Sequence, residues 1–186
     1  MRTVIVGGGL SGLSLAERLE ARGHDYRLLE ARGRFGGRII TEWRDGAAFD
    51  LGPAWFWPGQ PPARGGPYAL FGFIGVHAHA RRDEAALRHA LREQLGRLFG
   101  ARAAEPQRLL LKDWADDPLT ATQADTTPQY AHPAYGLPDA LEDLWEGHVN
   151  FAGTEVARQF GGFLEGALEA AEAVFARLTM RNDADV

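Results

Sequence analysis

The first thirty residues show two short apolar runs separated by a helical repeat. Thr3–Val6 is β-branched and apolar, which is typical of a buried strand. A glycine-rich stretch follows, and apolar side chains then recur at helical spacing over residues 13–19, with Gly23 placed to end the helix. Tyr26–Glu30 is a second strand candidate. The pattern therefore predicts a strand, a tight turn, a helix and a second strand within one short unit.

Two more helices are predicted from apolar stripes. Asp83 can cap a helix that ends at Gly100. The stripe of this helix consists of Leu87, Leu91, Leu95 and Leu98. The last helix begins near residue 162, and its stripe consists of Leu164, Leu168, Ala171, Phe175 and Leu178.

Short apolar and aromatic runs predict further strands in the rest of the chain. Residues 58–67 interrupt them with four prolines and three glycines, which is the strongest linker signal in the sequence. Residues 115–147 are expected to be mostly irregular. The strand candidates are Arg38–Trp43, Ala47–Leu51, Tyr68–Val76, Arg108–Trp114 and His148–Ala152.

Composition narrows the class of protein. The formal net charge of −5 over 186 residues disfavours a nucleic-acid-binding surface. The chain has no cysteine, so disulfides, thiolate metal sites and cysteine-linked cofactors are excluded. No apolar run approaches the roughly 20 residues of a membrane helix, and the first residues enter a strand without the pattern of a signal peptide. We therefore expect a cytoplasmic protein that binds neither nucleic acid nor membrane.

The glycines after the first strand have the spacing of a dinucleotide-binding turn. The motif Gly-x-Gly-x-x-Gly lies between a strand and a helix, and its glycines permit a tight turn, close approach to a pyrophosphate and close helix packing. Glu30 lies eighteen residues after Gly12, where an acid accepts hydrogen bonds from ribose hydroxyls and disfavours a 2′-phosphate. A structural turn without a ligand is the alternative. The candidate residues are Gly7, Gly8, Gly9, Leu10, Ser11, Gly12 and Glu30.

The segment after the second strand favours FAD over NAD, although both use the first motif. Residues 30–38 read Glu-Ala-Arg-Gly-Arg-Phe-Gly-Gly-Arg. Arg38 can bind a diphosphate with its planar guanidinium, Arg32 can flank the adenosine end, and Arg34 is expected to be a solvated surface charge. The candidate cofactor residues of this segment are Ala31, Arg32, Gly37 and Arg38.

Three later segments extend this motif. Asp50–Gln60 is rich in tryptophan and glycine, Phe151–Glu155 reads Phe-Ala-Gly-Thr-Glu, and Gly161–Ala167 reads Gly-Gly-Phe-Leu-Glu-Gly-Ala. With the arginine-rich string, they resemble the flavin-containing amine oxidases, the superfamily of monoamine oxidase and L-amino-acid oxidase. The resemblance covers roughly residues 1–60 and 68–178.

The resemblance implies an α/β fold, a Rossmann-like FAD/NAD(P)-binding domain with a reduced substrate-side α+β portion. The FAD-binding domain would be discontinuous, formed by residues 1–60 and 148–180, with the C-terminal helix packed against the first strand–helix unit. Residues 68–147 would be the residual substrate-side region, and residues 61–67 a linker or deletion seam.

The resemblance also implies roles for individual residues around a non-covalent FAD. One group would pass beneath the flavin, one would lie by the pyrophosphate and ribitol, and one would begin the last helix at the isoalloxazine. Tyr135 and Phe163 would form an aromatic cage for the amine, or alternatively both are core aromatics. The three groups are, in order, Gly52, Pro53, Ala54 and Trp55; Gly153, Thr154 and Glu155; and Gly162, Phe163 and Leu164.

The chain also departs from the family it resembles. Members are normally more than twice as long, and the part missing here would hold much of the substrate domain and the lysine beside flavin N5. The single lysine, Lys112, does not occupy that position, and Pro53 replaces a glycine. The short length is compatible with a natural compact form, an internal deletion or a fragment.

Two main functions follow from the resemblance. The first is an FAD-dependent oxidoreductase that oxidises the C–N bond of a small-molecule amine, with dioxygen as acceptor. The second is a non-catalytic FAD-binding module, or a remnant without a complete substrate pocket. A plain NAD-binding oxidoreductase is a weaker third hypothesis, because residues 151–167 then have no purpose. Tyr68–Val76 would lack its sheet neighbours, and the apolar surface exposed in this way predicts a homodimer or a poorly behaved monomer.

Overall fold

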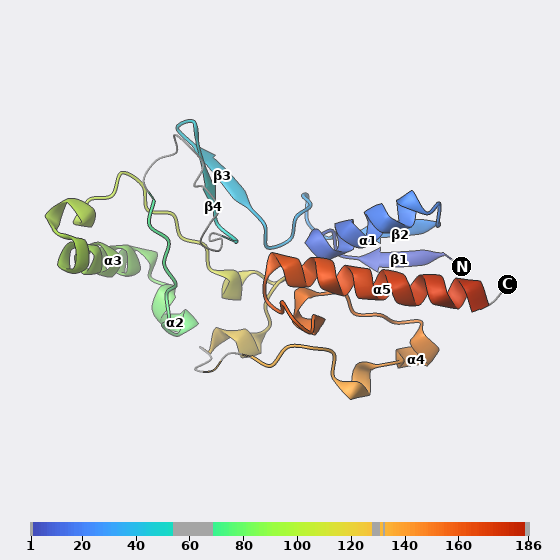
Figure 1. Ribbon diagram of the computed structural model, residues 1–186. Helices are drawn as coiled ribbons and strands as arrows, with labels where there is room; N and C mark the ends of the chain where they lie inside the picture. Colours follow the sequence, from blue (N-terminus) through green and yellow to red (C-terminus); the bar gives the residue numbers. More distant parts are fainter. Residues whose placement is uncertain (1, 54–68, 128–130, 132, 185–186) are drawn as a thin grey trace. The chain divides into compact units, whose positions relative to one another are not determined.

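The computed structural model of this chain describes residues 2–53, 69–127, 131 and 133–184 (Figure 1). The chain forms two compact units. The first unit comprises Met1–Trp43, Ala48–Trp55 and Pro133–Val186, and the second comprises Arg44–Ala47 and Phe56–His132.

The first unit begins with the predicted strand–turn–helix–strand motif. Strand β1 spans Thr3–Val6, helix α1 spans Leu10–Ala21, and strand β2 spans Tyr26–Leu29. The two strands pair in parallel, and the register runs from Thr3 opposite Tyr26 to Val6 opposite Leu29. Gly23, with a φ of +69°, follows the helix and provides the left-handed residue that ends it. The prediction for this motif is confirmed.

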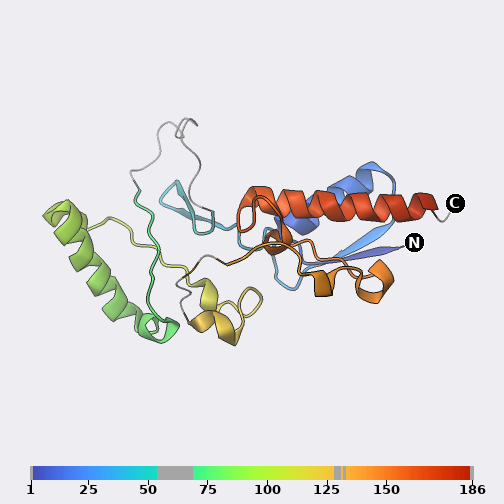
Figure 2. The same ribbon diagram turned by 60° about the horizontal axis from the view of Figure 1, so that its bottom comes forward.

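Helix α5, Leu164–Ala184, runs beside α1 in the same direction (Figures 1 and 2). The sequence predicts this helix and its packing on the first motif, and both are confirmed. The predicted stripe is partly wrong, because Leu164 is exposed and alanines occupy much of the contact face. Small side chains allow α5 to approach α1 closely. The core residues of this contact are Ile5, Leu15, Ala16, Leu19, Ala171, Val174 and Leu178.

The β1–β2 sheet is covered on one face only within the described residues. Ile5 packs into the core, whereas Val4 is 56% and Val6 is 84% exposed on the opposite face. Leu29 of β2 is exposed on the same side as Val6, its register partner. Parallel sheets in α/β proteins are normally covered on both faces. This sheet therefore presents an open apolar face.

A β-hairpin follows the first motif. Strand β3 spans Thr41–Arg44 and strand β4 spans Ala47–Asp50, which agrees with the predicted pair of strands. Asp45 and Gly46 at the turn have φ values of 52° and 78°. Two positive φ angles in an Asp-Gly pair are typical of a type I′ turn, whose twist matches that of the strands.

The second unit contains a four-residue helix, α2 (Ala78–Arg81), and a longer helix, α3 (Glu84–Phe99). The Asp83 side chain accepts a hydrogen bond of 2.9 Å from the backbone N–H of Ala86, and Gly100 follows the helix with a φ of +89°. The predicted cap and stop are therefore confirmed. The leucine stripe is only half-buried, and no side chain of α3 is fully buried.

The remaining described segments are irregular or form single turns. Helix α4, Leu144–Gly147, is a short turn in which Trp145 and Glu146 have left-handed backbone angles. The other turns are 3₁₀ helices, at Ala101–Ala104, Trp114–Asp116, Gln123–Thr126, Asp139–Leu141 and Thr154–Val156.

Three predicted strands are wrong. Residues 69–76, the described part of the run Tyr68–Val76, form no strand, and neither do Arg108–Trp114 or His148–Ala152. A strand needs a neighbouring strand for its hydrogen-bond ladder, and within the described residues none of these segments joins a sheet. Within the same described ranges, no helix combines the length and the apolar character needed to cross a membrane.

Candidate functional site

The glycine turn before α1 forms the base of the candidate site. Gly7 has a φ of +105°, and a Cβ on Gly12 would overlap the carbonyl oxygen of Gly7. Gly9 occupies the N-cap of α1 without a side-chain cap, and the first turn of the helix contains no acidic residue. The free N–H groups and the positive end of the helix dipole therefore suit a phosphate.

Glu30 contacts this turn directly. Its carboxylate accepts hydrogen bonds of 2.7 Å from the backbone N–H of Arg32 and 2.7 Å from that of Gly8. The hydrogen bond from Arg32 and the one from Gly8 outweigh desolvation, so the pKa of Glu30 lies below its ordinary value. Glu30 is thus a charged carboxylate that fixes the glycine turn, and its binding to ribose stays a prediction.

The arginine-rich segment passes against the same turn. The N–H of Gly36 donates to the carbonyl of Gly8 at 2.8 Å, and Gly9 and Gly36 form a parallel bridge. Gly37 has a φ of +59°, and a Cβ there would lie 3.2 Å from the Cα of Gly9. The two glycine segments therefore approach backbone to backbone, which side chains would prevent.

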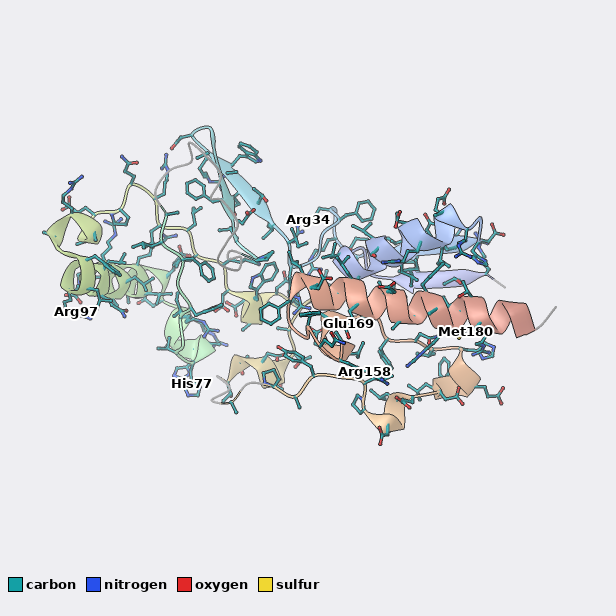
Figure 3. All side chains as sticks on the ribbon, in the orientation of Figure 1. Arg34, His77, Arg97, Arg158, Glu169 and Met180 are labelled. Atoms are coloured by element: carbon teal, nitrogen blue, oxygen red, sulfur yellow. The ribbon has the colours of Figure 1, made fainter. Side chains whose placement is uncertain are left out.

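Arg34 has a structural role that the sequence analysis missed. Its guanidinium donates to the carbonyl oxygens of Phe35, Ile39 and Gly37, at 3.2, 3.1 and 2.7 Å. The prediction of a solvated surface charge is therefore wrong, because the side chain folds back and holds residues 35–39. Figure 3 shows Arg34 at this loop.

Arg38 and Glu155, two predicted cofactor residues, form an ion pair. The guanidinium nitrogen of Arg38 lies 2.7 Å from a carboxylate oxygen of Glu155, and both side chains are about half exposed. A Cβ on Gly52 would overlap the carbonyl oxygen of Arg38, so Gly52 also lies against this segment. Pro53 is exposed, and the predicted residues Ala54 and Trp55 lie outside the described residues.

Residues 152–155 connect the N-terminal ends of α1 and α5. The Ser11 hydroxyl of α1 donates to the carbonyl of Ala152. Thr154, only 7% exposed, donates its hydroxyl hydrogen to the carbonyl of Phe163 at 2.8 Å, directly before α5. Gly153, Thr154 and Glu155 are therefore held between the two helix ends, and their contact with a cofactor stays a prediction.

Tyr135 lies against the turn that leads into α5. A Cβ on Gly161 or Gly162 would overlap the Tyr135 ring or its hydroxyl, so both glycines make room for this side chain. The N–H of Gly136 donates to the carbonyl of Glu155 at 2.9 Å. Phe163, 40% exposed, follows Gly162 directly. The structure thus places Tyr135 beside the backbone next to Phe163, while the aromatic cage stays a prediction.

Glu169 of α5 is a second residue that the sequence analysis missed. Its carboxylate accepts hydrogen bonds from the backbone N–H groups of Arg158, Gln159 and Phe160, the shortest being 2.8 Å. Desolvation raises the pKa of Glu169, but these bonds outweigh it and lower the pKa overall. A half-buried carboxylate on a helix gives no sequence signal for such contacts.

A pocket of about 280 Å³ lies against α5. Its lining includes Phe151, Val156, Arg158, Glu169 and Val174. None of the glycines of the predicted cofactor site lines it. The candidate site is therefore defined by the contacts between the glycine segments and not by this pocket.

Comparisons with known proteins identify the family. Residues 5–65 match the NAD(P)-binding Rossmann-like domain, and residues 57–178 match the family of flavin containing amine oxidoreductases. Polyamine oxidase 5 of Oryza sativa subsp. japonica is 38% identical over 52 residues, which are 28% of this chain and 11% of that protein. A 4,4'-diapophytoene desaturase (4,4'-diaponeurosporene-forming) of Staphylococcus aureus (strain MRSA252) is 37% identical over 54 residues, which are 29% of this chain and 11% of that protein.

A solved structure of wild-type putrescine oxidase bound to putrescine is 31% identical and covers 52% of this chain and 16% of its own. The TM-score of 0.28 is too low for a comparison of geometry. The chain thus matches only a small part of the length of these relatives. Because the second family match spans more than half of the chain, the chain belongs to the flavin containing amine oxidoreductases, a family with a flavin cofactor, and its N-terminal part has the Rossmann-like fold.

Proposed function

We propose that this protein binds FAD without a covalent bond and oxidises the C–N bond of a small-molecule amine, with dioxygen as acceptor. The observation that carries the proposal is the continuity of the candidate site. Segments far apart in the sequence, each predicted separately to touch one cofactor, are joined by hydrogen bonds. Gly8 bonds both the carboxylate of Glu30 and the backbone of Gly36. Glu155 bonds Arg38 through its side chain and Gly136 through its backbone. A structural turn without a ligand does not require this convergence.

The residues of the site fit FAD in their chemistry. The uncapped N-terminus of α1 and the Arg38 guanidinium would hold the diphosphate, and Glu30 would accept from ribose hydroxyls. Phe163 and Leu164, at the start of α5, would lie at the flavin edge, where the helix dipole favours negative charge. The chain has no cysteine, which supports non-covalent binding.

The amine substrate rests on the family and on two aromatic side chains. When bound, the flavin supplies the redox chemistry. Tyr135 beside Gly162, and Phe163 next in the chain, would orient an amine through their ring faces. Two proteins similar to this chain, polyamine oxidase 5 and putrescine oxidase, are named after an amine.

A visible absorption spectrum of the purified protein, with the released cofactor identified by mass spectrometry, tests FAD binding. We expect a flavin spectrum that persists through gel filtration, and released FAD rather than FMN. A colourless protein that stays without flavin after incubation with FAD would contradict the proposal. Anaerobic addition of a panel of mono-, di- and polyamines then tests the chemistry, and we expect flavin bleaching that air reverses.

A non-catalytic FAD-binding module is the second candidate. It is favoured by the small part of the relatives that the chain matches, 11% of polyamine oxidase 5. The one lysine, Lys112, does not match the lysine that the resemblance implies beside flavin N5, and its ammonium lies 4.4 Å from the ring centre of Trp114. Tight FAD binding without bleaching by any amine would favour this module over the enzyme.

A further inference from the structure

We infer that Glu169 is a positioning residue for the flavin edge, because its carboxylate holds the turn that presents Phe163. This inference rests on the proposed function. Glu169 itself touches neither the glycine turn nor any predicted cofactor residue in the contacts described above. It acts through the backbone of residues 158–160.

The first step is the anchoring of the turn. Three consecutive N–H groups, from Arg158 to Phe160, point at one carboxylate, at 2.8 to 3.3 Å. Successive N–H groups of this kind form an anion-binding concavity. Here the anion is part of α5, so the concavity attaches the preceding loop to the helix. Figure 3 shows Arg158 and Glu169 on the same side of α5.

The second step is the transmission to Phe163. The N–H of Phe163 donates to the carbonyl of Phe160 at 3.1 Å. Phe160, which Glu169 anchors, is therefore also bonded to Phe163, the residue proposed to lie at the flavin edge. A Cβ on Gly166 would overlap the same carbonyl, which shows how tightly the turn lies on α5. Gly161 and Gly162, which lie between Phe160 and Phe163 in the chain, are packed against Tyr135. Displacement of residues 158–160 therefore shifts Phe163 and the start of α5.

The charge on Glu169 strengthens the anchor. Its pKa is lowered overall, against the effect of desolvation, by the three backbone hydrogen bonds and by the nearby charge of Arg158. Glu172, on the same helix, provides a matched comparison. Its side chain is 68% exposed and lies 3.9 Å from Arg18, in a loose ion pair on the surface. Removal of either carboxylate changes the net charge equally.

The experiment compares the wild-type chain with Glu169→Ala, Glu169→Gln, Glu169→Asp and the control Glu172→Ala. Hydrogen–deuterium exchange of the FAD-free protein measures the anchor, and the absorption maximum and dissociation constant of added FAD measure the flavin edge. We expect exchange at residues 158–163 to accelerate about tenfold or more in Glu169→Ala and Glu169→Gln, since both remove the charged acceptor of three N–H groups. FAD should bind about tenfold more weakly to these variants, with a shifted flavin absorption maximum.

Rescue separates positioning from general destabilisation. Sodium acetate at high concentration should restore the flavin absorption maximum of Glu169→Ala, because acetate can occupy the three N–H groups, and should leave Glu169→Gln unchanged. Glu169→Asp should recover part of the effect, and Glu172→Ala should resemble the wild type. Unchanged exchange at residues 158–160, or faster exchange there with an unaltered flavin spectrum, would overturn the inference.

Failure of the proposed function gives a different result. If the wild type binds no FAD at all, the proposed function and the flavin role of Glu169 are both overturned, whatever the exchange data show. If the wild type binds FAD and Glu169→Ala binds it equally well with the same spectrum, only the role of Glu169 is overturned.

Discussion

Two carboxylates, Glu30 and Glu169, hold backbone N–H groups at opposite ends of the candidate cofactor site. Glu30 fixes the glycine turn before α1, and Glu169 fixes the turn before α5. The N–H groups that each carboxylate binds belong to a short irregular segment, outside the regular hydrogen-bond pattern of a helix or a sheet. At the scale of the residue, the site is therefore held by charged acceptors and by glycines that allow close approach.

The charge of Glu30 makes the stability of this unit depend on pH. Because the folded-state pKa of Glu30 is lowered, its contribution is present above the ordinary glutamate pKa of 4.5 and is lost as the pH falls through the folded value. We expect Glu30→Gln to lower the free energy of unfolding at pH 7 and to differ less from the wild type below pH 4.5. Urea unfolding at a series of pH values measures this difference.

Glu17→Gln provides the control for this pH dependence, because Glu17 is an exposed carboxylate on α1. It should follow the wild-type stability across the whole pH series. A constant difference between Glu30→Gln and the wild type from pH 7 to pH 3 would contradict the role of the carboxylate charge.

Several residue roles could be predicted from the sequence because they depend on local geometry. Gly7 and Gly12 are needed for a turn whose form follows from the motif itself. Arg34 and Glu169 could not be predicted, since their partners are backbone groups exposed only by the final path of irregular loops. The pairing of Arg38 with Glu155 joins residues 117 positions apart, although each was recognised separately.

At the scale of the element, the N-cap contributes to the stability of α3. None of its side chains is fully buried, so the cap adds to what its half-buried leucines contribute. We expect Asp83→Ala to destabilise α3 by about 0.5–2 kcal/mol through loss of the hydrogen bond to Ala86. Far-ultraviolet circular dichroism during urea unfolding measures the loss of helix. Asp83→Asn retains a capping side chain and should lie near the wild type, and an equal loss in both variants would argue against the cap.

The helices and the two pairs of successive strands, β1–β2 and β3–β4, could be predicted from the sequence, whereas three further apolar runs predicted as strands form none among the residues that the structure describes. Helices α1, α3 and α5 contain their own bonds, stripes and end signals. The run over residues 69–76 is as apolar as a buried strand but joins no sheet within the described part of the chain. Apolar composition shows that a segment favours burial, and only the rest of the fold provides the neighbour.

At the scale of the whole molecule, α1 and α5 cover one face of the sheet in the first unit, and within the part of the chain that the structure describes the other face is open. Val4, Val6 and Leu29 are exposed there, and large apolar patches usually mark an interface. The sequence predicted exposed apolar surface at the run before α2, and Phe73 is indeed 77% exposed. The open face of β1 and β2 was not foreseen.

This open face leads us to expect self-association of the chain, with a homodimer as the simplest form. Threonine keeps the β-branched shape that suits a strand while reducing the apolar area, so the double variant Val4→Thr/Val6→Thr should preserve the fold and weaken association. Light scattering coupled to gel filtration over a range of concentrations should show a smaller mean mass for the double variant than for the wild type. Met180→Gln removes an exposed apolar side chain from α5 instead and should leave the mass unchanged. A wild type that stays monomeric at every concentration would contradict the expectation, and an equal effect of Met180→Gln would show that association does not depend on the sheet face.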